Sequence, residues 1–207
     1  MPHGSRFNAD GTKHYSACMM DNQLVEIDAA TLDVSRRLDL VHNRAAEAPD
    51  AGHHAMPPPD NHCSPTWAAP HPDGSRVYVP CNRGDVILEV DVESWSITRR
   101  FEAEGAPYNL DVTPDGSKLL ATLKGGARFG IWDLATGEPG HFVDSLRPVT
   151  HGVISTPDSR YAFVTVEGIG GDPGTVEVID LESGLRVAET TVGKQAGGIA
   201  FWKMEAH

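Results

Sequence analysis

Short runs of alternating apolar and polar residues fill most of the chain, and tight polar turns separate them. In the stretch 64–101, an apolar segment leads into a Pro-Asp-Gly turn, and the runs RVYVP, VILEVDV and SITRRF follow with polar turns between them. Runs of this kind, bounded by Gly, Asp and Asn, are typical of β-strands joined by hairpin turns. The stretch therefore predicts a four-stranded antiparallel meander. The sequence has no sustained helical periodicity with capping residues, so we expect almost no helix.

The same pattern returns along the chain at a nearly constant spacing. An aspartate in the first turn recurs after 63, 42 and 43 residues, and an aspartate that ends a later apolar run recurs after 63, 42 and 47 residues. The first set is Asp10, Asp73, Asp115 and Asp158, and the second set is Asp28, Asp91, Asp133 and Asp180. A period of about 40–45 residues with four strands per unit is typical of β-propeller blades. We expect both sets of carboxylates to accept backbone N–H groups in their turns.

The acidic composition narrows the classes of partner. The 207 residues include 17 Lys and Arg against 29 Asp and Glu, which gives a formal net charge of −12. Nucleic-acid binding needs clustered basic side chains, and those of this chain are scattered, so we expect no nucleic-acid partner. No run approaches the roughly 18 apolar residues of a membrane helix, so we also expect no membrane span.

The repeats resemble those of a known family. The pattern PDG-x-x-x-[YFL]-V…V-x-V-[IV]-D-x-x-[ST] is clearest in RVYVPCNRGDVILEVDVESW and in YAFVTVEGIGGDPGTVEVIDLESG. It resembles the YVTN-type repeat of YncE-like β-propeller proteins, in a superfamily with lactonase-like and cytochrome-d1-like members. The resemblance implies an all-β, seven-bladed type of propeller and a periplasmic or other extracytoplasmic location. The N-terminus lacks the features of a signal peptide, so a cytoplasmic location is the alternative.

We expect one β-propeller domain over residues 1–207, with about four blades of four antiparallel strands. Residues 41–62 interrupt the period and are predicted to form an inter-blade loop, and residues 194–204 match only the inner strand of a further blade. The predicted blades are residues 3–40, 63–104, 105–147 and 148–192. Because such a ring cannot close alone, we expect a partial propeller that either lacks N-terminal blades or forms a homodimer.

The candidate ligand-binding residues lie at matching places near the starts of the first strands, where a propeller has the mouth of its central channel. They are His3, Thr66, Trp67, Tyr108, Asn109 and His151. The tripeptides Pro-His-Gly and Thr-His-Gly stand at equivalent places in the first and fourth repeats, and glycine lets a ligand approach closely. The imidazoles suit a metal or haem iron, a polar ligand, or acid–base chemistry, and hydrogen bonding to strand ends is the plainer alternative.

Histidines and cysteines also gather in and after the predicted loop. Imidazole and sulfur ligands suit copper or zinc, although no C-x-x-C or H-E-x-x-H spacing is present, and a surface loop is the alternative. The candidate metal ligands are His3, His151, His62 and Cys63. Counting along the hairpin places Cys63 near Cys81, which leaves open a disulfide in an oxidising compartment and two buried thiols.

No catalytic residues are predicted. The chain has no nucleophile elbow, no phosphate-binding loop and no paired carboxylates at the channel positions, and Glu167 and Glu177 are expected to be solvated. We therefore expect a non-enzymatic module without a cofactor, which recognises a small molecule or a protein on its channel face. The alternative is a redox propeller that holds copper or haem through channel histidines. A lactonase-like hydrolase is the third hypothesis.

Overall fold

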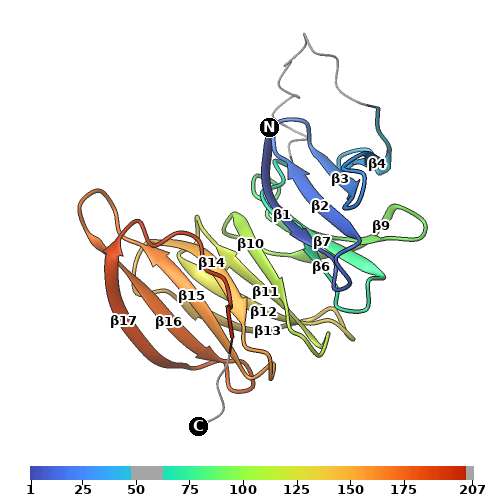
Figure 1. The fold of residues 1–207 in the computed structure, drawn as a ribbon. Coiled ribbons are helices and arrows are strands. Elements are labelled where there is room, and N and C mark those ends of the chain that lie inside the picture. The colour runs from blue at the N-terminus through green and yellow to red at the C-terminus, as the bar shows by residue number, and fades with distance from the viewer. Residues whose placement is uncertain (48–62, 204–207) are drawn as a thin grey trace. The chain divides into compact units, whose positions relative to one another are not determined.

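The strands predicted from the repeats are present in four antiparallel sheets. The computed structural model describes residues 1–47 and 63–203, and these residues include no helix. The first sheet contains β1 (Pro2–Phe7), β2 (Lys13–Cys18), β3 (Gln23–Asp28), β4 (Val34–Asp39) and the short β5 (Arg44–Ala45). The second contains β6 (Ala69–Pro70), β7 (Arg76–Cys81), β8 (Val86–Asp91) and β9 (Ser96–Glu102), as Figure 1 shows.

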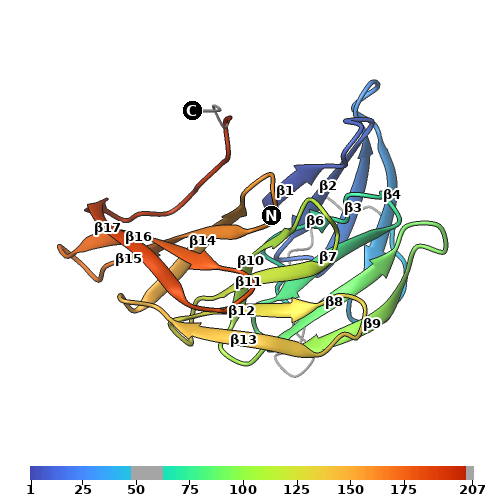
Figure 2. The ribbon, with the colours of Figure 1, turned by 90° about the horizontal axis from the view of Figure 1, so that it is seen from below.

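The other two sheets repeat this order of strands. The third contains β10 (Pro107–Val112), β11 (Lys118–Leu123), β12 (Arg128–Asp133) and β13 (Pro139–Asp144). The fourth contains β14 (Val149–Ser155), β15 (Tyr161–Glu167), β16 (Pro173–Asp180) and β17 (Arg186–Lys194), seen in orange and red in Figure 2. Within every sheet the strands lie side by side in chain order. This is the predicted meander, and no crossover connection occurs in these sheets.

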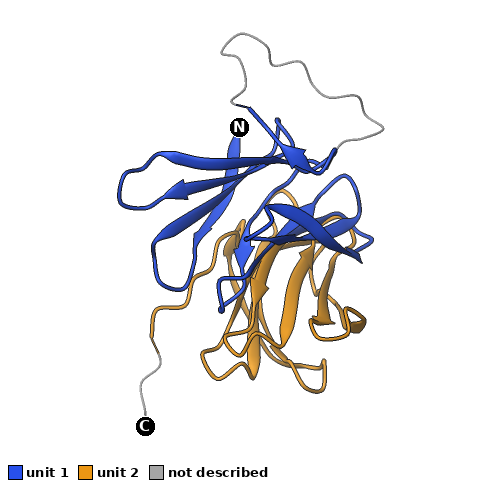
Figure 3. Cartoon of the chain, turned by 90° about the vertical axis from the view of Figure 1, so that its right-hand side faces the viewer, with its two compact units in different colours: residues 1–108 blue, residues 109–207 orange. Residues whose placement is uncertain are grey.

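The chain forms two compact units, which we describe separately. The first is Met1–Tyr108 and the second is Asn109–His207, blue and orange in Figure 3. In the first unit, apolar side chains from the facing sides of two sheets form one core, which includes Tyr15, Leu24, Val79 and Leu88. Burial of such side chains supplies most of the stabilisation of a small sheet, because one sheet cannot bury both faces alone.

The core of the second unit joins the third and fourth sheets in the same way. Leu120 and Phe129 of the third sheet pack with Val164 and Ile179 of the fourth. The corresponding residues of successive repeats thus occupy corresponding places in the two cores. Leu120 aligns with Tyr15 of the first repeat, and both are almost fully buried, with 0% and 2% exposure.

The turn aspartates act as the repeats predicted. In the first set, Asp73 Oδ1 accepts the N–H of Ser75 at 2.8 Å, and Asp115 Oδ1 accepts that of Ser117 at 3.0 Å. In the second set, Asp91 Oδ1 accepts the N–H of Ser94 at 2.7 Å. These bonds satisfy backbone donors that the tight turns leave without strand partners. The expected role of both sets is confirmed.

Two local expectations differ from the structure. Residues 41–62 were predicted to contain no strand, but Arg44–Ala45 forms β5 and pairs with β4; residues 48–62 lie outside the described part of the chain. Residues 194–204 were predicted to begin a further blade as a strand, yet 195–203 form no strand. A strand needs a neighbour with which to pair, and none among the described residues pairs with this segment.

The segment after β17 nevertheless follows the spacing of the repeats. Thr122 Oγ1 in β11 donates to the carbonyl of His151 at 2.9 Å. At the corresponding place in the next repeat, the hydroxyl of Thr165 donates to the carbonyl of Gly197. The Gly197 carbonyl thus accepts a threonine hydroxyl in the same way as the carbonyl of His151 in the first strand β14. The predicted position of this segment is therefore reproduced locally, although its predicted strand pairing is not.

Candidate functional site

Four of the predicted residues meet in the first unit, and we call them the first-strand cluster: His3, Thr66, Trp67 and Tyr108. The carbonyl of Thr66 accepts the N–H of Gly4 at 2.9 Å and lies 2.7 Å from His3 Nδ1. Thr66 Oγ1 donates to the carbonyl of Tyr108 at 2.6 Å. Thr66 is fully buried. Its backbone and hydroxyl therefore tie β1, the segment before β6 and the start of β10 together.

His3 connects the cluster through both ring nitrogens. A neutral imidazole whose Nδ1 faces a carbonyl carries its proton there, so Nε2 is left as an acceptor. The Tyr108 hydroxyl lies 3.2 Å from Nε2 and is placed to donate to it. His3 is thus oriented by a backbone carbonyl on one side and a phenol on the other. This arrangement is the hydrogen-bonding role that the sequence left open for His3.

Three aromatic rings pack against one another in this cluster. The His3 ring meets Trp67 with centroids 5.9 Å apart and Tyr108 with centroids 5.4 Å apart, both edge to face. The centroids of Trp67 and Tyr108 are 6.3 Å apart. These spacings are those of direct ring packing. The rings leave no room for a ligand between them, so a ligand would bind on the cluster and not inside it.

Trp67 depends on the glycine next to His3. A Cβ at Gly4 would lie 2.3 Å from two ring carbons of Trp67, which only a residue without a side chain avoids. The indole Nε1 of Trp67 is buried and has no hydrogen-bond partner among the described residues. A buried indole N–H normally finds an acceptor. The indole N–H of Trp67 therefore lies inside the cluster, and the ring is the part of Trp67 that is partly exposed.

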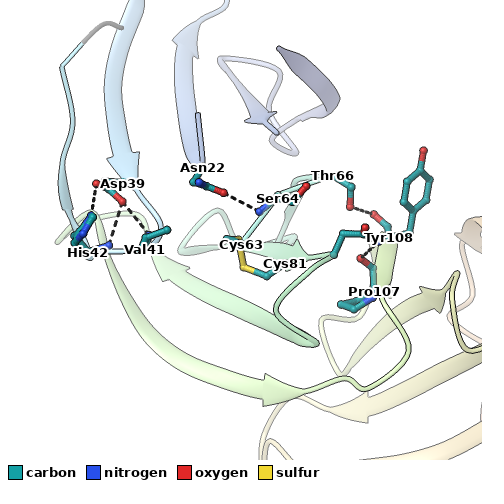
Figure 4. The surroundings of a disulfide bond; sticks show 11 residues. Asn22, Asp39, Val41, His42, Cys63, Ser64, Thr66, Cys81, Pro107 and Tyr108 are labelled. Carbon is teal, nitrogen blue, oxygen red and sulfur yellow. Dashed lines mark hydrogen bonds and ion pairs between the residues drawn. A yellow bond between two sulfur atoms is a disulfide. The ribbon is translucent and has the colours of Figure 1, made fainter. Parts of the chain in front are cut away.

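A disulfide lies directly beside the cluster. Cys63 and Cys81 are bonded through their sulfur atoms, with Cα atoms 4.4 Å apart (Figure 4). Of the two alternatives that the sequence left open, the disulfide is the one present. Cys18 is a free thiol whose pKa is raised by burial.

The disulfide also bears on the predicted metal ligands. A disulfide sulfur is not the thiolate that binds a metal, so Cys63 could act as a ligand only in the reduced chain. His62 lies outside the described residues. Residues 1–47 and 63–203 contain no group of three or more His, Cys, Asp or Glu side chains placed to hold a metal ion.

The other two predicted channel residues belong to the second unit. Asn109 is 4% exposed, and its N–H donates to Thr122 Oγ1 at 2.9 Å. Its Oδ1 is buried and accepts no hydrogen bond from any described residue. The carbonyl of His151 accepts from Thr122 Oγ1, and His151 Nε2 lies 3.4 Å from Glu167 Oε1. Thr122, which the sequence did not single out, thus joins the two predicted residues.

The expectation that Glu177 is solvated is wrong. Glu177 is 1% exposed, accepts from Arg186 Nε at 2.9 Å and accepts the N–H of Leu146 at 2.8 Å. A buried carboxylate needs such partners to offset its lost hydration. Arg186 stands in the last strand of the same sheet, but the register pairs it with Ile179 and pairs Glu177 with Glu189. Counting along the strands therefore does not predict the contact between Glu177 and Arg186.

A small cavity lies elsewhere in the second unit. Its volume is about 200 Å³, and its lining includes the polar side chains of Lys118, Asp133, His141 and Glu182. Asp133 already accepts the N–H of Thr136 at 2.8 Å in its turn. None of the predicted binding residues lines this cavity.

Comparisons with known proteins bear on the fold. No protein-family model matches the chain, and no curated protein sequence matches it. Among solved structures, hydrazine synthase of Kuenenia stuttgartiensis is similar, with a TM-score of 0.78 and 18% identity over 93% of this chain and 49% of that chain.

Two further solved structures are similar at 15–16% identity. The Cps50 (Swd1) β-propeller domain of Myceliophteria thermophila has a TM-score of 0.70 and 15% identity, over 95% of this chain and 58% of that chain. The structure of U3-55K has a TM-score of 0.69 and 16% identity, over 95% of this chain and 53% of that chain. The chain thus spans about half the length of these proteins.

These likenesses and the four antiparallel meanders show that the chain has the β-propeller fold as a partial propeller. The chain has no helix suited to crossing a membrane in the part that the structure describes. Membership of the YncE-like family stays a prediction.

Proposed function

We propose that this chain is a non-enzymatic binding module that contacts a small molecule or a protein through the first-strand cluster. The observation that carries the proposal is the packed group of His3, Trp67 and Tyr108 on a fully buried Thr66. Aromatic side chains with a polar end are the residues that most often carry binding energy at protein surfaces. Here they are held in place before any ligand arrives, which lowers the entropic cost of binding.

The cluster combines a ring surface with polar groups. Trp67 and Tyr108 are partly exposed and His3 is exposed. A planar or apolar group can pack on the rings, while the oxygen of the Tyr108 hydroxyl can accept a hydrogen bond from a ligand. No acid–base pair in the cluster is aimed at a common reacting atom, because both nitrogens of His3 already face partners. Recognition therefore fits this arrangement better than catalysis.

Indole resonances provide a direct test. The chain has four tryptophans, so labelled indole N–H groups report separately on Trp67 and on the exposed Trp202. The probes are indole, tetramethylammonium, methyl glucoside and N-acetylarginine amide, which represent ring, organic-cation, sugar and guanidinium ligands. At least one probe is expected to shift the Trp67 signal and leave that of Trp202 unchanged.

Two matched variants distinguish binding at the first-strand cluster from non-specific binding to an exposed aromatic side chain. Trp67→Ala is expected to weaken binding of the active probe at least about tenfold, as for a central aromatic contact. Trp202→Ala should leave that affinity unchanged, because Trp202 is 88% exposed and belongs to the second unit. If no probe at millimolar concentration moves the Trp67 signal, or if both variants bind equally, the proposal is wrong.

We also propose that the module works without a cofactor and in an oxidising compartment outside the cytoplasm. Disulfides persist mainly in such compartments, and the Cys63–Cys81 bond supports that location. The copper and haem alternatives predict instead that the purified protein contains one of these groups. Metal analysis and an absorption spectrum of the purified protein are expected to show neither copper nor haem in stoichiometric amount.

A further inference from the structure

The first strand of the second sheet is much shorter than its counterparts. β6 spans two residues, whereas β1, β10 and β14 span six, six and seven. Upstream of β6, the strand pairing with β7 is one isolated bridge between Pro65 and Cys81. The hydrogen bonds of that bridge come from the N–H groups of Thr66 and Asn82, on either side of the pair. The residues that enter the first-strand cluster from this segment are therefore held by few regular strand contacts.

The backbone hydrogen bonds that join this segment to β7 and to the turn after it are long. The N–H of Thr66 lies 3.4 Å from the carbonyl of Pro80, and that of Asn82 lies 3.3 Å from the carbonyl of Ser64. The N–H of Arg83 lies 3.2 Å from the carbonyl of Cys63. Protein N–H···O bonds are most often near 2.9–3.0 Å and weaken beyond that distance. These three contacts alone hold the segment only weakly against β7 and its following turn.

The disulfide is the covalent tie at this weak point. Cys63 and Cys81 are 6% and 2% exposed and belong to the apolar core of the first unit. Between them lie the whole of β6 and most of β7. The places that match Cys81 in the other repeats hold Cys18, Leu123 and Val166, and Cys18 is unbonded. The disulfide therefore occurs in the sheet whose first strand is the shortest of the four.

Ser64, which follows the first cysteine, shows how closely this segment is constrained. Its φ is 54°, a left-handed value that a residue with a side chain adopts only when its surroundings enforce it. The N–H of Ser64 donates to Asn22 Oδ1 at 2.8 Å, and Asn22 is itself buried. Two residues later, Thr66 makes the contacts that join His3, Gly4 and Tyr108. A displacement at Cys63 is thus carried along three residues into the cluster.

We propose that the Cys63–Cys81 disulfide is a redox control on the first-strand cluster, an inference that rests on the proposed function of that cluster. The oxidised chain presents His3, Trp67 and Tyr108 as one packed surface. In the reduced chain the segment 63–67 is free to leave β7, the Thr66 contacts loosen and the surface loses its shape. The binding module is then active only after oxidation.

The chemistry of the step is a thiol–disulfide exchange. A dithiol reductant attacks one sulfur of the pair, the Cys63–Cys81 bond breaks, and a mixed disulfide forms. The second thiol of the reductant then displaces the protein thiolate, so the reductant leaves as its own disulfide. Two electrons and two protons have passed to the protein, whose cysteines are now thiols. Oxidation by a disulfide donor reverses the sequence.

Hydrogen exchange on the full chain tests the positional part of the proposal. We compare the oxidised protein, the protein reduced by dithiothreitol, and the double variant Cys63→Ala/Cys81→Ala, with Cys18→Ala as the matched control. After reduction, the amides of Gly4, Thr66 and Asn82 are expected to exchange at least about tenfold faster, as for a local opening. The amides of β14–β17 should keep their rates, and Cys18→Ala should behave as the oxidised parent.

Two results of that comparison would overturn the proposal. One is unchanged protection of Gly4 and Thr66 after reduction, since the disulfide would then not position the cluster. The other is an equal loss of protection in both units, because the disulfide would then act only on overall stability. Using chemical reduction beside the double variant keeps the test valid if the variant folds poorly.

Measuring the affinity of the probe for the oxidised and the reduced protein tests redox control separately from the proposed binding function. The probe that shifts the Trp67 indole in the oxidised protein is expected to lose at least about tenfold in affinity on reduction. If no probe binds the oxidised protein, the proposed function fails, while the exchange data still decide the coupling. If a probe binds oxidised and reduced protein equally, redox control fails and the binding function stands.

Discussion

Gly4 lies against the ring of Trp67, and its lack of a side chain is what lets the two approach. A Cβ there would also lie 2.5 Å from the carbonyl of Thr66. We expect Gly4→Ala to lower the free energy of unfolding by about 1–3 kcal/mol, the usual cost of overpacking, and to change the tryptophan fluorescence of the folded chain. Urea unfolding followed by tryptophan emission measures both effects.

Gly193→Ala is the control for that substitution. Gly193 stands in β17, and a Cβ there would meet no atom within 4 Å. Its effect on stability should stay within about 0.5 kcal/mol, as for surface changes without a special feature. Equal effects of the two substitutions would mean that Gly4 matters for its backbone and not for its contact with Trp67.

A threonine hydroxyl links first strands to second strands in both repeats of the second unit. Thr122 Oγ1 accepts the N–H of Asn109 and donates to the carbonyl of His151, both at 2.9 Å. In the next repeat, Thr165 Oγ1 accepts the N–H of Gly152 at 2.9 Å and donates to Gly197. The Thr122 hydroxyl thus satisfies the buried N–H of Asn109 and the carbonyl of His151, which are two of the predicted channel residues.

Removing that hydroxyl isolates its contribution. Thr122→Val keeps the shape of the side chain but leaves the buried N–H of Asn109 without its acceptor. We expect a loss of about 1–3 kcal/mol in the free energy of unfolding, the desolvation cost of an unpaired buried group. Thr190→Val on the exposed strand β17 is the matched control and should change stability by less than about 0.5 kcal/mol. Equal losses would assign no special role to Thr122.

At the element scale, periodicity predicted more of the fold than of the site. The two sets of turn aspartates placed the hairpins, because each turn needs an acceptor for its free N–H groups wherever it occurs. By contrast, β5 forms from Arg44 and Ala45, which carry no strand pattern, because the edge of β4 offers them partners. Strand pairing at an edge depends on the neighbour, which a local pattern does not contain.

The candidate site was predictable as positions but not as contacts. Aligning the repeats placed His3, Thr66 and Tyr108 at one corresponding position and Trp67 one residue after it. It did not show that His3 bonds the Thr66 carbonyl, because that contact joins residues 63 positions apart. Glu177 shows the same limit. Its burial depends on Arg186 and on the N–H of Leu146, which lies 31 residues away in the chain.

The turn aspartates together give the whole molecule a definite pH dependence. Eight of them have lowered pKa values, and in most cases the main cause is hydrogen bonding to turn N–H and hydroxyl groups. They are Asp10, Asp28, Asp73, Asp91, Asp115, Asp133, Asp158 and Asp180. In Asp73, burial acts to raise the pKa, but hydrogen bonds from Ser75 and His71 outweigh it and lower the pKa to about 2.

The sign of the effect on stability follows from these shifts. An unfolded aspartate has a pKa of about 3.9, so below about pH 5 the unfolded chain binds more protons than the folded chain. The stabilisation from each turn aspartate is therefore complete above the unfolded pKa and is lost as the pH falls through the folded pKa. For Asp73 the loss lies between about pH 4 and pH 2.

Urea unfolding at a series of pH values from 7 to 2 measures this dependence, and the midpoint is expected to fall steadily below pH 5. In the variant Asp73→Asn/Asp115→Asn, two of the contributing carboxylates no longer titrate. The variant should be less stable than the parent at pH 7 and should approach it as the pH falls toward 2, because the parent's two carboxylates take up protons over that range. Because the two curves must converge if the carboxylates carry the effect, parallel curves would show that acid acts on other groups.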